Sequence, residues 1–285
     1  DKEDIEKVEE YLKLFDDDLK SPNSKDALDW KKKADKGDLN AILRYAEMLN
    51  IGFGALINKE EALKYWEKGA ELGSSLAMYQ IAYCLRHGIG IQKNINESIR
   101  YYKMAAEKGL SVAMINLGHM YFVGEEIEEN QKEAYKYYTM AAKHGNVNAL
   151  INIGNMFYHG KGKEENKKLG MQFYKKAADL GNEQAMHTYD SLLIGDSIIT
   201  KNISESEFND AMKYLKMAAD KGYVDAMIEY AINKIFKDGF NFCDPEIARY
   251  LRMGADHGDK KCKELLSLNG TNDDNSIFLN QSAED

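Results

Sequence analysis

Seven copies of a short motif that ends in glycine divide this chain at nearly constant intervals. The motif is usually a pair of small residues, two further residues and a glycine, as in Ala-Ala-Glu-Lys-Gly at 105–109. Successive glycines lie 36, 36, 36, 36, 41 and 36 residues apart, at Gly37, Gly73, Gly109, Gly145, Gly181, Gly222 and Gly258. A period in this range is typical of a stacked repeat array, in which each repeat packs only on its neighbours.

Composition narrows the class of array. The 285 residues include two prolines, Pro22 and Pro245, so the middle of the chain favours helix. The formal net charge is −9, and acidic and basic residues are interleaved. This disfavours nucleic acid as a partner, because phosphate contact needs a coherent basic stripe. No stretch is apolar for long enough to predict direct membrane insertion.

Cysteine usage bears on the compartment. Cys84, Cys243 and Cys262 do not make an even-numbered disulfide framework, which favours a reducing, cytoplasmic location. Four Asn-x-Ser/Thr sequons, such as the one at Asn96, keep a secretory lumen or secretion as the alternative. The chain begins at Asp1 instead of methionine, so a missing targeting signal or further domain stays open.

The glycines set the repeat boundaries. We expect six helix-turn-helix repeats, each opening with alanine and carrying a second small residue five positions later, which lets helices pack closely. The fifth repeat breaks this rule with Asp190, so we expect weaker packing there. The repeats are predicted at 41–76, 77–112, 113–148, 149–184, 185–225 and 226–261.

Glycines are expected to end both helices of each repeat. Pairs such as Gly88 and Gly90 follow the first helix, where a chain reversal requires positive φ. A phosphate-binding loop is disfavoured, because the pair follows a helix instead of a strand and recurs. The motif glycine is placed as the C′ cap of the second helix.

The second helices carry aromatic residues at constant spacing. Pairs such as Tyr101 and Tyr102 follow a small residue by three positions, which predicts packing within and between repeats. The fifth repeat has five extra residues around 198–205, which we expect to lengthen the loop between its helices. Gly239 stands alone in the sixth repeat.

The two ends are predicted to cap the array. Residues 1–40 are expected to form N-terminal capping helices, with Ser24 as a helix N-cap. A C-terminal capping helix is predicted at 262–268. Residues 269–285 are rich in Asn, Asp and Ser and are predicted to be disordered.

The whole pattern resembles the Sel-one-like repeat (SLR) family of tetratricopeptide-like solenoids. The match rests on Ala-x₄-small-x₅-Gly-x-Gly, small-x₂-aromatic and Ala-Ala-x₂-Gly, as in Ala77, Ala82, Gly88, Gly90, Tyr101, Ala105, Ala106 and Gly109. It covers about 41–261. The resemblance implies an all-α, right-handed α-α superhelix and a role as adaptor or scaffold. It implies no particular partner, and the paired cysteines of some members are missing here.

In such a superhelix the first helices line the concave face. By helical spacing, the third, fourth, seventh, tenth and eleventh residues of the middle repeats should face inward, with Ile115 and Ile151 among them. Asn side chains can hydrogen-bond an extended peptide while rings bury its side chains, and an arginine can bind a carboxylate. Several of these rings can instead finish helix packing. The candidate residues are Tyr79, Gln80, Tyr83, Arg86, His87, Asn116, His119, Phe122, Asn152, Asn155, Tyr158 and His159.

Metal binding and catalysis are weaker hypotheses. His87, His119 and His159 could converge on a metal, but no His-x₃-His or Cys-x₂-Cys spacing supports this. No nucleophile elbow, P-loop or isolated carboxylate pair is present, and the glutamates near 125–129 are expected to be solvated. The sequence therefore predicts no cofactor, no metal and no enzymatic activity.

The leading hypothesis is a protein-interaction scaffold that binds a peptide or helix of a partner protein on its concave face. The alternatives are self-association, a docking module of a larger protein, or a regulatory subunit of a separate enzyme. Fold alone does not identify the partner.

Overall fold

The computed structural model describes residues 24–200, 204–237 and 244–270, and in this part of the chain every regular element is an α-helix. The chain divides into two compact units after Glu165. The predicted all-α repeat fold is confirmed. The predicted tail 269–285 and the lone Gly239 lie wholly or largely outside the described residues.

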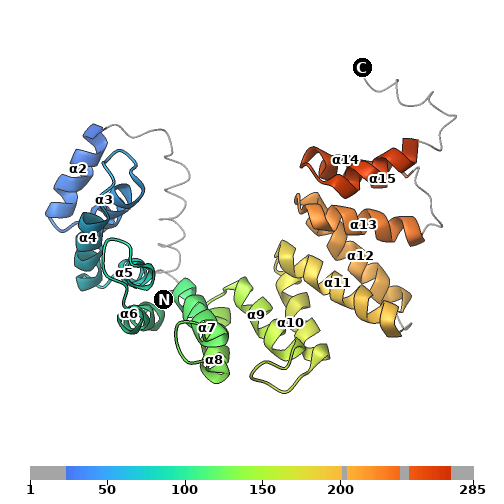
Figure 1. The fold of residues 1–285 in the computed structure, drawn as a ribbon, viewed down its shortest axis with the longest axis horizontal. Coiled ribbons are helices and arrows are strands. Elements are labelled where there is room, and N and C mark those ends of the chain that lie inside the picture. Colours follow the sequence, from blue (N-terminus) through green and yellow to red (C-terminus); the bar gives the residue numbers. More distant parts are fainter. Residues whose placement is uncertain (1–23, 201–203, 238–243, 271–285) are drawn as a thin grey trace, which may run out of the picture. The chain divides into compact units, whose positions relative to one another are not determined.

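The first helix of unit 1 that the structure describes is α2 (Ser24–Asp35), and helix pairs follow it. Within unit 1, each helix from α3 to α9 packs on the helix that precedes it in the chain, so the first helices α5 and α7 contact the second helices on both sides of them. The odd-numbered helices lie on the inner side of unit 1 and the even-numbered ones on its outer side (Figure 1). The helices are α3 (Leu39–Ile51), α4 (Lys59–Glu71), α5 (Ser75–His87), α6 (Ile95–Glu107), α7 (Ser111–Val123), α8 (Gln131–Lys143) and α9 (Val147–Tyr158).

In unit 2, first and second helices again alternate along the chain, but the lengths of these helices are less regular. Its helices are α10 (Lys167–Asp179), α11 (Glu183–Thr200), α12 (Glu205–Asp220), α13 (Val224–Lys237), α14 (Pro245–Asp256) and α15 (Lys260–Gly270). The expected long loop near 198–205 is wrong for the residues described. The extra residues instead extend α11 to 18 residues and α12 to 16, against 12 or 13 in each of α3–α10.

Local sequence explains where the helices begin. An asparagine precedes each second helix from α4 to α10, and its side chain accepts a hydrogen bond from the backbone N–H three residues later. This satisfies one of the N–H groups that a helix start leaves unpaired. Because these caps recur every 36 residues, they are a sequence signal for helix starts that the pattern of glycines and alanines does not include. They are Asn58, Asn94, Asn130 and Asn166.

Glycine ends the helices for two different reasons. All seven motif glycines have φ between 81° and 97°, as predicted for C′ caps. An added Cβ at Gly37 or Gly145 would meet nothing within 4 Å, so backbone conformation alone requires glycine there. Gly90 also has positive φ, but its Cβ would lie 2.7 Å from the backbone of Lys59. At this position glycine also allows close approach to the preceding repeat.

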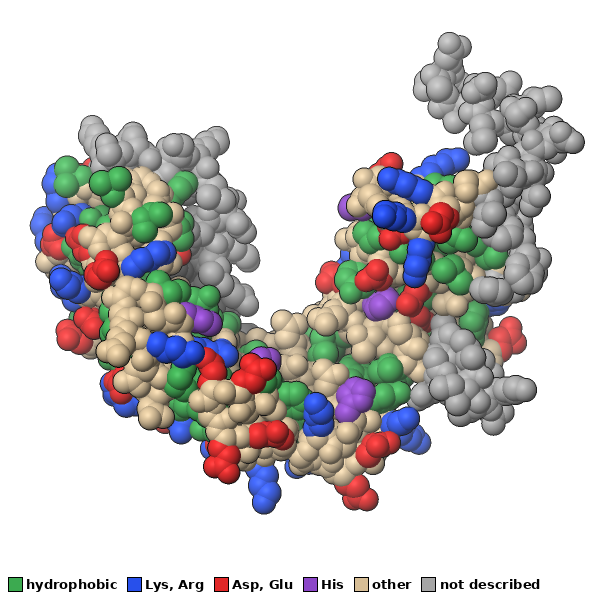
Figure 2. Space-filling view, viewed as in Figure 1, with side chains coloured by type: hydrophobic (Ala, Val, Ile, Leu, Met, Phe, Trp, Pro, Cys, Tyr) green, Lys and Arg blue, Asp and Glu red, His purple; other side chains and the backbone are tan. Residues whose placement is uncertain are grey.

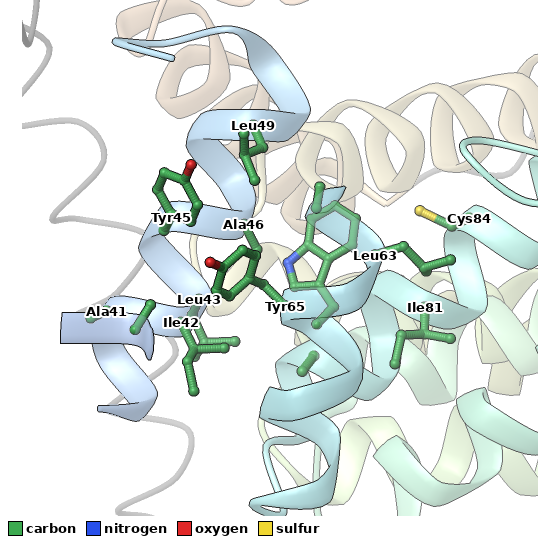
Figure 3. Packing of buried hydrophobic residues seen from close by; sticks show 14 of the residues in the cluster. Ala41, Ile42, Leu43, Tyr45, Ala46, Leu49, Leu63, Tyr65, Ile81 and Cys84 are labelled. Atoms are coloured by element: carbon green, nitrogen blue, oxygen red, sulfur yellow. The ribbon is translucent and has the colours of Figure 1, made fainter. Parts of the chain in front are cut away.

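The core consists of layers of alanine and large rings. Figure 3 shows α3 side chains such as Leu43 and Leu49 facing α4, with Ile81 of α5 on the other side of α4. Gly118 shows how tight the layers are, because an added Cβ would lie 2.5 Å from the ring of Tyr138. The predicted packing role of the second-helix aromatics is confirmed for those buried in the structure: Tyr65, Trp66, Tyr102, Tyr137, Tyr138, Tyr174 and Tyr214.

Candidate functional site

The candidate surface is the inner side of unit 1, formed by α5, α7 and α9 (Figure 1). All twelve predicted binding residues come from these helices or from the residue that directly follows α9. The 36-residue period places equivalent residues at the same level of successive helices, as in Tyr83, His119 and Asn155. We call this surface the inner face.

The predicted residues differ in exposure. Tyr83 is 40% exposed, and His87, His119 and His159 are also exposed. Seven are half-buried: Tyr79, Gln80, Arg86, Asn116, Phe122, Asn152 and Asn155. Tyr158 is only 7% exposed, and Ile151 is equally buried. The expectation that Tyr158 lines an open surface is therefore wrong, and its ring is a packing element of the fourth repeat.

Ring contacts hold several side chains of the inner face in place. The rings of Tyr83 and His87 lie one helical turn apart with their centroids 4.3 Å from each other. Tyr79 packs its ring 5.7 Å from that of buried Tyr102, and burial raises the pKa of its hydroxyl. Asn116 donates a hydrogen bond to the carbonyl of Val112 at 3.0 Å. Part of the predicted polar lining is thus already engaged within the array.

An ion-pair network corrects the role predicted for Arg86. Its Nε lies 2.5 Å from a carboxylate oxygen of Glu126, and Nζ of Lys93 lies 3.1 Å from the other oxygen. Arg86 therefore binds a carboxylate of this chain, whereas the sequence prediction expected it to bind a carboxylate of a ligand. Burial pushes the pKa of Glu126 up, but the hydrogen bonds from Lys93 and Arg86 and their charges outweigh it and lower the pKa.

The sequence prediction missed Glu126 and Lys93 and expected Glu126 to be a solvated loop residue. Its side chain is 22% exposed. A signal was available, because Glu126 stands two residues after Gly124, where the flanking repeats have Gly90 and Gly162. The glycines at this position approach the preceding repeat closely. A carboxylate in their place is therefore expected to contact that repeat.

Charge is distributed unevenly between the inner and outer helices of unit 1. Among Lys, Arg, Asp and Glu, the helices α5, α7 and α9 together contain one residue, Arg86, and the remaining inner helix, α3, contains two, Arg44 and Glu47. The outer helices contain seven in α4, four in α6 and four in α8. In Figure 2 such charged side chains crowd the outer margin of unit 1. The inner face thus combines exposed rings with very little charge.

A pocket lies at the loop edge of unit 1. Its volume is about 490 Å³, and it is lined by Phe122, Val123, Glu129, Gln131, Gly160, Lys161 and Gly162. Nζ of Lys161 lies 5.1 Å from the ring centre of Phe122, a contact in which the cation is attracted by the ring face. The pocket connects Phe122 and Val123, at the end of α7, with the loops that follow α7 and α9.

The inner helices of unit 2 have a different polar chemistry. His187 and Ser191 of α11 both contact Glu229 of α13, with His187 Nε2 3.2 Å and Ser191 Oγ 3.0 Å from its carboxylate oxygens. The Ser191 hydroxyl and the carboxylate share the same imidazole nitrogen, and they lie 3.5 Å and 3.2 Å from it. A nucleophile relay needs them on opposite nitrogens, so this cluster lacks that geometry.

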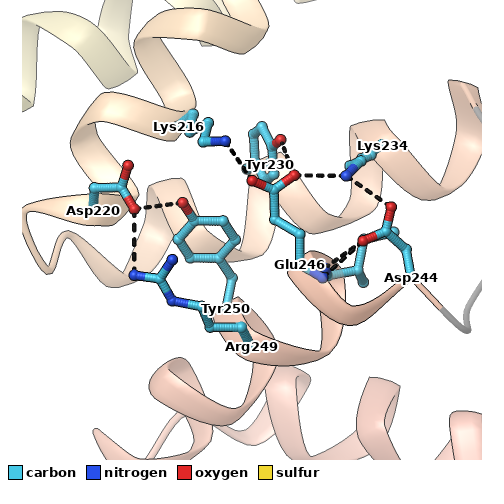
Figure 4. Close-up of polar contacts among 9 residues, drawn as sticks. Lys216, Asp220, Tyr230, Lys234, Asp244, Glu246, Arg249 and Tyr250 are labelled. Carbon is cyan, nitrogen blue, oxygen red and sulfur yellow. Dashed lines mark hydrogen bonds and ion pairs between the residues drawn. The ribbon is translucent and has the colours of Figure 1, made fainter.

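A second network joins α12, α13 and α14 in unit 2 (Figure 4). Glu246 accepts hydrogen bonds from Lys216, from Tyr230 at 2.8 Å and from Lys234 at 2.6 Å. The two lysines lower the pKa of Glu246 to about 2. Tyr250 donates to Asp220 at 2.6 Å, which links α14 to the end of the preceding outer helix.

Two other kinds of site are absent from the described part of the chain. Within 24–200, 204–237 and 244–270, no group of three or more His, Cys, Asp or Glu side chains is placed to hold a metal ion. In the same ranges, no helix has the length and apolarity needed to cross a membrane.

The architecture defines the class of protein. Stacked helix pairs, nearly constant in length from α3 to α10, with glycine caps between them and alanines at their crossings, make an α-helical repeat protein. Within that class, the model of the Sel1 repeat matches five segments: 39–74, 75–110, 111–146, 147–182 and 192–223. These matches cover more than half of the chain, which therefore belongs to the Sel1 repeat family, as its sequence pattern predicts. A search of curated proteins found no match.

Two solved structures share the fold. One is a protective antigen of uropathogenic Escherichia coli with an SLR fold, with a TM-score of 0.66 and 21% identity over 87% of this chain. This chain spans about half of that protein, 52% of its length. The other is a Sel1 repeat protein from Oxalobacter formigenes, with a TM-score of 0.64 and 24% identity, covering 82% of this chain and all of the other.

The family gives a general class of function. Sel1 repeat proteins generally mediate protein–protein interaction and are typically non-enzymatic. As a class, Sel1 repeats suggest protein partners.

Proposed function

We propose that this protein is a non-enzymatic interaction scaffold whose inner face, in unit 1, binds an extended peptide or a helix of a partner protein. The observation that carries the proposal is the depletion of charge on α5, α7 and α9 beside exposed aromatic and imidazole rings. Depletion of charge together with enrichment in aromatic residues is what distinguishes the centre of a protein interface from ordinary surface.

The same observation indicates the chemistry of the partner. Tyr83 and His119 offer ring surface and hydrogen-bonding groups, and Arg86 is paired with Glu126. A partner segment that is rich in aromatic or aliphatic side chains and low in charge fits this surface. Its binding should depend weakly on salt, because screening acts mainly on exposed charges.

The test uses a random peptide library displayed on phage and selected on the immobilised full chain. Enriched peptides are synthesised, and their Kd is measured at low and high salt. The double variant Tyr83→Glu/His119→Glu places two carboxylates on the inner face. Lys132→Glu is the matched control, because it changes the net charge equally at an exposed site on outer helix α8. We expect the double variant to weaken binding at least tenfold and the control to bind as wild type does.

Two results would contradict the proposal. One is equal binding of the selected peptides by wild type, double variant and control, which would place the site elsewhere. The other is selection of strongly charged peptides whose affinity collapses with salt. Circular dichroism of the double variant separates loss of binding from loss of fold, and both substituted side chains are exposed.

A further inference from the structure

Asp190 is a carboxylate in a place where the other repeats have alanine or glycine. The position is five residues after the opening alanine of each repeat, and its occupants elsewhere are Ala46, Ala82, Gly118, Gly154 and Ala231. Asp190 is fully buried, and neither of its carboxylate oxygens has a hydrogen-bond partner. Ionised groups are rarely buried without a partner, because the lost hydration is not replaced.

The fold explains how this side chain fits. In the third repeat, the equivalent Gly118 abuts the ring of Tyr138. The residue that corresponds to Tyr138 in the fifth repeat is Leu215, which is also fully buried. By this equivalence we expect Leu215 to lie opposite Asp190, where a smaller leucine and a larger aspartate keep the packed volume similar. Sterically the exchange is tolerable, and its cost is electrostatic.

The surroundings of Asp190 only partly compensate a negative charge there, through His187. His187 on its own helix is held by Glu229 of α13, and Glu229 itself repels a second negative charge. On the neighbouring helices, Lys175 of α10 donates a hydrogen bond to the hydroxyl of Tyr214 of α12. Both side chains also contact the ring of Tyr189.

We propose that Asp190 makes the fifth repeat a proton-dependent element, in which α11 packs tightly while this carboxyl is protonated and loosens from its neighbours when it ionises. Burial raises the pKa of Asp190 to about 8, with Glu229 adding to the shift and His187 opposing it. The folded repeat therefore holds a proton that the opened repeat releases.

The sign of the pH dependence follows from this proton. A group whose pKa is raised in the folded state favours that state fully below its ordinary value, near 3.8, and this contribution is lost as the pH rises to about 8. Over that window, opening of α11 should become easier by about tenfold per pH unit, because one proton is released. The shifted pKa of His187, raised chiefly by its hydrogen bond to Glu229, acts in the same direction, so the test must separate the two.

The test is hydrogen–deuterium exchange of the full chain between pH 6 and pH 8, read by mass spectrometry on peptides from 183–200. Wild type is compared with Asp190→Asn at each pH, because intrinsic exchange rates then cancel and His187 is common to both. We expect the ratio of wild-type to variant exchange in α11 to rise about tenfold per pH unit, and peptides from α5 and α7 to show no such trend. Asp210→Asn, at an exposed site on α12, should behave as wild type does.

A ratio in α11 that stays constant with pH would overturn the proposal, as would an equal trend in the unit 1 peptides. Asp190→Ala provides a second comparison that also cannot ionise and has the residue found in other repeats. It keeps the test valid if the buried asparagine unfolds the fifth repeat.

Discussion

The inner helices of the two units follow one repeat pattern but differ in chemistry. In unit 1, α5, α7 and α9 carry a single charged residue, whereas in unit 2, α11 carries three and α13 carries four. Unit 1 fills the second small position of each repeat with Ala or Gly, and unit 2 has Asp190 at one such position. The repeat pattern thus fixes packing, while positions outside the pattern are free to give each unit its own surface chemistry and stability.

Placing an aspartate at the unit 1 position that corresponds to Asp190 should have the largest effect on stability. Gly118→Asp should destabilise unit 1 by about 3–5 kcal/mol, because its Cβ would already collide with Tyr138 and a buried carboxyl would be left without a partner. The measurement is urea unfolding followed by tryptophan fluorescence, since Trp30 and Trp66 both lie in unit 1.

The matched control for this exchange is His119→Asp, which adds the same side chain at an exposed neighbouring position. It should change stability by less than about 0.5 kcal/mol. Equal stability of the two variants would show that the crossing of α7 with α8 is not tightly packed.

The reverse change should stabilise unit 2. Asp190→Ala removes an unpartnered buried carboxyl and restores the residue found in other repeats, so we expect a gain of about 1–3 kcal/mol at pH 7. Thermal unfolding by circular dichroism measures it, with Asp210→Ala on the surface of α12 as control. A loss of stability would mean that the carboxyl has a stabilising contact.

The Glu246 network gives unit 2 an acid-sensitive contribution. Because the pKa of Glu246 is lowered to about 2, its contribution is present above its ordinary value of 4.5 and is lost as the pH falls through that window. Glu246→Gln should cost about 1–2 kcal/mol at pH 7 and flatten the dependence between pH 4.5 and pH 2. Urea unfolding across this range tests it, and the exposed Glu205→Gln should leave the wild-type slope unchanged.

The smallest change is expected at the ion pair of unit 1. Glu126→Gln should destabilise unit 1 by about 1 kcal/mol or less, because Arg86 and Lys93 keep access to solvent. The difference from wild type should shrink in high salt. Glu128→Gln, a change in the same loop, is the control, and an equal effect of both would remove the ion pair as its cause.

Local chemistry that repeats along the sequence is enough to predict the fold class, the helix pairs, the capping glycines and the family. Positive φ requires glycine at Gly73 and Gly109, and close helix crossings require small residues such as Ala77. The Asn58 and Asn94 caps were equally readable, since they recur with the same period.

Stacking of the repeats, in contrast, decides which inner residues are exposed to a ligand and which are already buried or paired within the chain. Arg86 and Glu126 are 40 residues apart, and only the packing of two repeats brings them together. Likewise, periodicity assigns Tyr158 to the inner set, but its burial depends on the neighbours that surround it. Local propensity repeats along the chain, whereas exposure, pairing and the protonation of Asp190 are properties of the packed array.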